Sequence, residues 1–209
     1  LLKPQAEAKP SEMMKTGSFY LIWLIYFIGA GAGLMVIGSV AGMAQKSMGE
    51  LAFIAVAILA IGNAGGRIIA GIISDKIGRR VTLIIMLLFQ AALMLIAIPL
   101  VGAQKASPML IVLIATFMGF CYGTNLSLFP SLTKDNWGLK NFGINYGLVF
   151  TAWGVGGFVM GRLSQMLIAG TGRYTTSFLT AAVLLVIGAV LTVFMKGKKS
   201  APQAAAQKA

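Results

Sequence analysis

Histidine is absent from this sequence of 209 residues, and cysteine occurs once, as Cys121. Acidic residues are also scarce, with five Asp and Glu against 17 Lys and Arg. A disulfide framework or a Cys/His metal site cannot be assembled from this set. No nucleophile–base pair and no phosphate-binding glycine loop is evident either. The sequence therefore predicts no metal, no cofactor and no enzymatic activity.

Charged residues make up only 11% of the chain and hydrophobic residues 58%, whereas an ordinary soluble domain has about 25% charged residues. The apolar residues gather in runs of about 20, the length that crosses a bilayer as a helix. These runs predict an all-α integral membrane bundle of six helices at residues 19–43, 51–73, 81–101, 109–132, 145–169 and 174–195. We expect a linker at 1–17, the bundle at 18–196 and a basic tail at 197–209.

The net charge of +12 follows from where the basic residues fall between these runs. One predicted side holds Lys46, Lys105 and Arg173, and the other holds Lys3, Lys9, Lys15, Lys76, Arg79, Arg80, Lys134, Lys140, Lys196, Lys198, Lys199 and Lys208. Because loops rich in Lys and Arg stay in the cytoplasm, linker and tail are predicted to be cytoplasmic. This topology explains the basic excess without a nucleic-acid partner and places the protein in the plasma (inner) membrane.

Glycines recur four residues apart within the predicted spans, at positions 29 and 33, 38 and 42, 62 and 66, and 157 and 161. This spacing lets helix backbones approach closely. Smooth glycine faces would also let helices tilt against each other during transport. Simple packing and gating both explain the pattern.

A charged motif, Gly-Ile-Ile-Ser-Asp-Lys-Ile-Gly-Arg-Arg, closes the second span. It resembles the G-x-x-x-D-(R/K)-x-G-(R/K)-(R/K) signature of the major facilitator superfamily. The resemblance implies two six-helix bundles, of which this chain would be the C-terminal one, with an N-terminal half as its partner. A conformational switch is then expected at Gly71, Asp75, Lys76, Gly78, Arg79 and Arg80, where Gly71 permits tight packing, Gly78 a turn and Asp75 a charge pair. A solvated loop that only sets topology is the alternative.

Arg67 lies inside the second span, where a charge costs about 2.5–3.5 kcal/mol on insertion scales. The five acidic residues, Glu7, Glu12, Glu50, Asp75 and Asp135, all lie in linkers or loops. A partner for Arg67 must therefore be an anionic substrate, a carboxylate on another bundle or water, unless the side chain snorkels to the headgroups. Its planar guanidinium suits a carboxylate, so an anionic substrate is our first choice.

Further polar residues are predicted at the same depth as Arg67. Asn63 lies one turn before it on the same helical face, and Tyr122 and Asn125 lie near the middle of the fourth span. These residues, Arg67, Asn63, Tyr122 and Asn125, are our candidate substrate-binding set, and interhelical hydrogen bonding without a ligand is the alternative for the last two. We interpret Tyr146, Phe150, Trp153 and Arg162 as structural.

The pair Asn63-x-x-x-Arg67 resembles the eighth helix of monocarboxylate transporters, where an aspartate precedes the substrate-binding arginine. Gly119-Phe-Cys-Tyr-Gly123 and Gly161-Arg-Leu163 resemble the tenth and eleventh helices. The match borders on oxalate/formate antiporters and implies a lactate–proton symporter. Asn63 cannot titrate, so another group would carry the proton. No lysine lies within a predicted span, which favours a monoanion over oxalate.

Secondary active transport of a small monocarboxylate such as L-lactate, coupled to protons by alternating access, is the function we predict. One alternative is an exchanger of organic anions of the oxalate/formate type, which would need substrate in the opposite compartment. A second is a self-contained six-helix membrane subunit or channel, which would work without another half.

Overall fold

The computed structural model describes residues 7–102 and 107–195. The predicted tail and the first six residues of the predicted linker lie outside these ranges. Within them every regular element is helical: α1 Pro10–Met13, α2 Gly17–Met48, a 3₁₀ turn Gly49–Leu51, α3 Ala52–Ile77, α4 Arg79–Gly102, α5 Pro108–Trp137, α6 Phe142–Thr171 and α7 Tyr174–Val193. The predicted all-α class is confirmed.

Six of these helices, α2 to α7, are long and apolar enough to cross a membrane. Each coincides with one predicted apolar run, and most extend beyond it by a few residues. The extension arises because backbone hydrogen bonds within a helix do not require apolar side chains. Thus α3 continues through Asp75 and Lys76, and α5 continues to Trp137.

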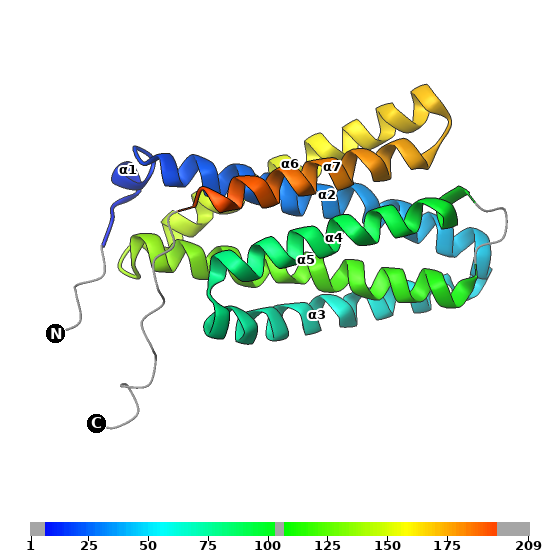
Figure 1. Ribbon diagram of the computed structural model, residues 1–209, viewed down its shortest axis with the longest axis horizontal. Helices are drawn as coiled ribbons and strands as arrows, with labels where there is room; N and C mark the ends of the chain where they lie inside the picture. Colours follow the sequence, from blue (N-terminus) through cyan, green and yellow to red (C-terminus); the bar gives the residue numbers. More distant parts are fainter. Residues whose placement is uncertain (1–6, 103–106, 196–209) are drawn as a thin grey trace.

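The helices run along a common long axis and pack mainly in three pairs, α3 on α5, α4 on α7 and α2 on α6. Figure 1 shows the start of α2, the end of α7, the α3–α4 turn and the α5–α6 turn at the same end of the bundle. This end, called the basic end below, carries Lys76, Arg79, Arg80, Lys134 and Lys140. The clustering agrees with the predicted sidedness of the basic residues.

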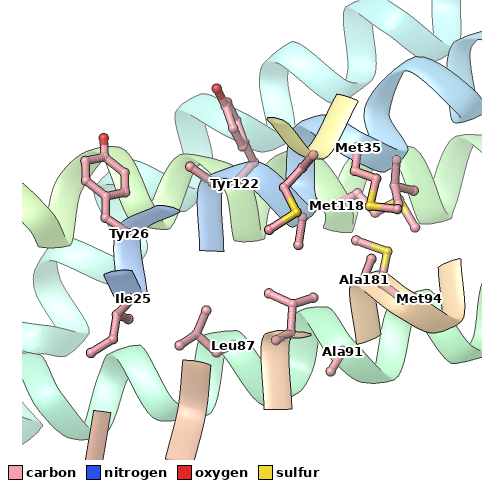
Figure 2. Packing of buried hydrophobic residues seen from close by; sticks show 14 of the residues in the cluster. Ile25, Tyr26, Met35, Leu87, Ala91, Met94, Met118, Tyr122 and Ala181 are labelled. Atoms are coloured by element: carbon pink, nitrogen blue, oxygen red, sulfur yellow. The ribbon is translucent and has the colours of Figure 1, made fainter. Parts of the chain in front are cut away.

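Apolar side chains from α2, α4, α5 and α7 fill the interior of the bundle. Figure 2 shows Met35, Leu87, Met94, Met118 and Ala181 in this core, and each is at most 3% exposed. The outer helices differ, since only 22% of the apolar window of α3 and of α6 is buried, against 61% for α2. α3 and α6 therefore present long apolar faces to whatever surrounds the bundle.

Glycines on both helices bring the backbones of α3 and α5 into direct contact. A methyl group added at Gly66 would lie 2.0 Å from the carbonyl oxygen of Phe120, and one added at Gly123 would lie 2.0 Å from that of Asn63. Methyl groups added at Gly62 and Gly119 would likewise lie 2.2 Å from the carbonyl oxygens of Thr116 and Leu59, respectively. The close approach expected from positions 62 and 66 is thus present, and it fixes the helix of Arg67 against the helix of Tyr122.

The segment before α2 is docked against the α5–α6 turn. Ala8 N donates to the Trp137 carbonyl at 3.0 Å, and the amides of Asn141 and Asn145 both donate to the Ala8 carbonyl at 3.1 Å. Met13 of α1 is fully buried, and α1 contacts α6. The described part of the predicted linker is therefore packed onto the basic end of the bundle.

Candidate functional site

Arg67 lies on α3, and its side chain is exposed. Its Nε donates a hydrogen bond to Asn63 Oδ1 at 3.0 Å, as expected for residues one turn apart on one helix face. Both ion pairs found in the described residues belong to Arg79, so no carboxylate in this part of the chain neutralises Arg67. Within the described residues its two terminal amino groups have no hydrogen-bond partner, which leaves them available for an anion.

Three tyrosines from three other helices lie within electrostatic range of the Arg67 guanidinium: Tyr26 of α2, Tyr122 of α5 and Tyr146 of α6. Figure 2 shows the rings of Tyr26 and Tyr122 directed to the same side, away from Leu87 and Ala91. The Tyr122 hydroxyl accepts a hydrogen bond from Trp153 Nε1 of α6. The site thus combines one fixed positive charge with phenol groups, a set suited to an oxyanion.

The Tyr26 hydroxyl is buried and has no hydrogen-bond partner among the described residues. Its polar neighbour is the hydroxyl of Tyr146 on α6. A buried polar group left unpaired costs about 1–3 kcal/mol. The facing phenol of Tyr146 offsets this cost for Tyr26.

Asn125 is placed differently from the other predicted site residues. It is 2% exposed, and its amide donates to the Cys121 carbonyl of its own helix. Its Oδ1 lies 2.9 Å from where a methyl group on Gly29 of α2 would be, so the side chain packs between α5 and α2. No hydrogen bond joins Asn125 to Arg67 in the described residues, and its amide bond stays within α5.

Aromatic residues on α6 connect this site to the basic end of the bundle. Ring centroids are 5.7 Å apart for Phe142 and Tyr146, 5.5 Å for Tyr146 and Phe150, and 5.2 Å for Phe150 and Trp153. Tyr146 and Trp153, which the sequence analysis interprets as structural, are the neighbours of Tyr26 and Tyr122 respectively. The sequence feature that could have identified these two residues is the spacing of α6 aromatics by about one helical turn. The sequence feature that could have identified Tyr26 is a tyrosine hydroxyl within an otherwise apolar run.

The predicted switch residues form a charged cluster that joins three helices. Arg79 of α4 pairs with Asp75 of α3 at 2.6 Å and with Asp135 of α5 at 3.3 Å. Arg79 also donates to the Ser74 hydroxyl. Because one guanidinium contacts all three helix ends, their relative positions at the basic end depend on it.

The remaining switch residues differ in what they contribute. Gly78 ends α3 with φ +92°, a conformation that side chains rarely adopt, so the predicted turn is present. Arg80 donates to the Val193 carbonyl at the end of α7, while Lys76 is exposed. At Gly71 the expected tight packing is absent, because an added methyl would make an ordinary 3.4 Å contact with Ser127 Oγ.

Burial predicts that Asp135 stabilises this cluster more than Asp75 does, although Asp75 is nearer to Arg79. The side chains of Arg79 and Asp135 are 12% and 17% exposed, whereas that of Asp75 is 55% exposed. We expect Asp135→Asn to cost about 1–3 kcal/mol and Asp75→Asn less than about 1 kcal/mol. Apparent melting temperatures of the purified full-length protein measure both. A larger loss in Asp75→Asn would contradict this order.

The comparisons with known proteins agree on one family. The sequence model of the Major Facilitator Superfamily matches residues 22–209. An uncharacterized MFS-type transporter of Escherichia coli K12, YhjX, is 30% identical over 70% of this chain and 36% of its own length. The oxalate:formate antiporter of Oxalobacter formigenes is 28% identical over 91% of this chain and 45% of its own length. The chain thus spans less than half the length of these relatives, and it belongs to the Major Facilitator Superfamily.

Proposed function

We propose that this bundle is the C-terminal half of a transporter that carries a small monocarboxylate, such as L-lactate, across the plasma (inner) membrane. The observation that carries the proposal is the Arg67 guanidinium, which lies within a span and has no carboxylate partner in the described residues. A charge at this depth is costly unless something compensates for it. A substrate carboxylate is the partner whose shape fits two parallel N–H donors.

The composition of the site supports a substrate with one negative charge. Arg67 is accompanied by phenol groups rather than by a second cation. In the low dielectric of a span, a dianion held by one guanidinium would keep an uncompensated charge. The name of the relative from Oxalobacter formigenes includes both a monoanion, formate, and a dianion, oxalate. We propose that the substrate of this protein is a monoanion.

A second six-helix bundle is the proposed partner of the exposed surfaces of α3 and α6. α3 and α6 are the least buried spans, and Arg67 and Trp153 lie on them. Covering these surfaces with an N-terminal half would enclose the substrate between two bundles. Rocking of the bundles would then expose the site to each side in turn. The Arg79 cluster would act as the switch, by holding α3, α4 and α5 together in one of the two states.

The proposal also includes a coupling mode, which is proton symport rather than anion exchange. Asn63 does not titrate, so in a proton symporter the proton would travel on another group or on the substrate itself. Exchange is the second candidate, and the antiporter relative favours it. The two modes differ in one requirement, because exchange needs an anion in the opposite compartment and symport does not.

Uptake by proteoliposomes containing the full-length transporter tests both modes. We expect labelled lactate to enter empty vesicles, and to enter faster with an inward proton gradient. We expect oxalate to compete at least about tenfold less well, because its second charge is unpaired. Uptake only into vesicles preloaded with anion would assign exchange instead. Absence of carboxylate uptake in both arrangements would contradict the proposed function.

A further inference from the structure

Trp153 of α6 forms a hydrogen bond with a phenol on a neighbouring helix. Its indole Nε1 donates to the Tyr122 hydroxyl of α5, and its ring stacks on Phe150 of its own helix with planes 8° apart. Tyr122 is buried, and its ring packs against Gly33 of α2, where an added methyl group would lie 3.0 Å from Cδ2. The Tyr122 ring is therefore held by α2, and its oxygen is held by α6.

The bond to Trp153 decides which way the Tyr122 proton points. An indole N–H donates and cannot accept, so the phenol oxygen is the acceptor in this bond. The phenol proton must then point away from the indole. No described residue accepts a hydrogen bond from the Tyr122 hydroxyl. Tyr122 thus presents a donor that has a fixed direction and no partner in the described part of the chain.

The contact between α3 and α5 places Tyr122 on the same side as Arg67. The two helices run parallel, since both finish at the basic end (Figure 1), and Gly66 and Gly123 lie in the contact between them. Successive side chains turn by about 100° around a helix. Arg67, which follows Gly66, and Tyr122, which precedes Gly123, therefore project to the same side of the pair. A methyl group on Gly123 would lie 2.0 Å from the carbonyl oxygen of Asn63, the hydrogen-bond partner of Arg67, so the depths also agree.

We propose that Trp153 is a positioning residue, which holds the Tyr122 phenol so that its proton is donated to the carboxylate bound by Arg67. This inference rests on the proposed function and adds to it a residue that acts through Tyr122. A carboxylate has about four acceptor positions on its two oxygens, so it accepts from a guanidinium and a phenol together. Without the indole the phenol proton is free to turn to other directions, and part of its hydrogen bond to the substrate is lost.

The first test is Trp153→Phe in the full-length transporter, with Trp23→Phe as its matched control. Trp23 of α2 also stacks on a phenylalanine of its own helix, and its Nε1 also donates to a hydroxyl of another helix, Thr151 Oγ1 at 2.9 Å. Both changes thus remove an indole N–H from similar surroundings. In equilibrium binding we expect Trp153→Phe to hold lactate about fivefold more weakly than the parent. Trp23→Phe should bind lactate as the parent does.

The second test is Trp153→Phe combined with Tyr122→Phe, which shows whether the indole acts through the phenol. Residues that act as one unit give non-additive effects. We expect Tyr122→Phe alone to bind lactate about tenfold more weakly than the parent. The double variant should bind no more weakly than Tyr122→Phe alone. Melting curves of every variant without lactate measure the effect on folding separately.

The outcomes separate this inference from the proposed function. A parent that binds no small monocarboxylate overturns the proposed function. A parent that binds lactate, combined with an unchanged affinity in Trp153→Phe or in Tyr122→Phe, overturns the Trp153 inference alone. A loss from Trp153→Phe that is equally large when the phenol is absent also overturns it, because the indole would then act without Tyr122. An equal loss of affinity in Trp23→Phe would do the same, since any interhelical indole bond would then suffice.

Discussion

Arg67→Ala is expected to reduce lactate uptake roughly 100-fold, because hydrogen bonds to charged groups contribute about 1.5–3 kcal/mol and the substrate charge would lose its countercharge. Arg67→Lys keeps the charge but not the planar pair of donors. We therefore expect Lys to restore only part of the uptake. Initial rates in proteoliposomes, corrected for the amount of folded protein, measure both variants.

Arg162 is the matched control for this experiment. It also lies within a span, it is exposed, and its guanidinium bonds to Gln165 Oε1 at 3.2 Å on its own helix. We interpret it as structural, so Arg162→Ala should retain uptake within about twofold of the parent. Full uptake in Arg67→Ala, or an equal loss in both alanine variants, would show that Arg67 has no specific role.

Gly66→Ala is expected to destabilise the protein strongly through the contact between α3 and α5. The added methyl group would lie 2.0 Å from the Phe120 carbonyl oxygen, and a backbone atom cannot turn aside as a side chain does. Overpacking costs about 1–3 kcal/mol even where side chains adjust. We expect a loss above this range and little folded protein in detergent.

Gly65→Ala provides the comparison on the same helix, because a methyl group there meets nothing within 4 Å. Replacing a helical glycine by alanine in open space raises helix stability by up to about 1 kcal/mol. Yield and melting temperature should therefore stay at the parent level or rise. Similar melting temperatures for the two variants would mean that α3 and α5 do not meet as closely as described.

The spans could be predicted from the sequence because each is a long apolar run, and a bilayer requires that length. The pairing of Asn63 with Arg67 could also be predicted, since it depends only on positions one turn apart on one helix. The contact at Gly62 and Gly66 was indicated by spacing, but its partners Gly119 and Gly123 were not. Identifying them requires knowing which helix packs on which, and composition does not contain that information.

The direction in which a side chain points is harder to predict from the sequence than its depth in the membrane. Tyr122 and Asn125 are predicted at similar depth, and the structure places Tyr122 within electrostatic range of Arg67, whereas Asn125 packs toward Gly29 of α2. Tyr26 was not predicted for the same reason, since nothing in its apolar run indicates that it lies within electrostatic range of Arg67. Helix rotation is set by packing against neighbours, and here the close glycine contacts determine it.

The most direct test of the central claim, that Arg67 binds the substrate carboxylate, is equilibrium binding of lactate and its neutral analogue lactamide to the full-length protein. The two molecules have nearly the same shape and differ in charge. We predict that the parent binds lactate at least about tenfold more tightly than lactamide, and that Arg67→Ala abolishes this preference. Equal affinity for both molecules, or a preference for lactate that persists without Arg67, would contradict the claim.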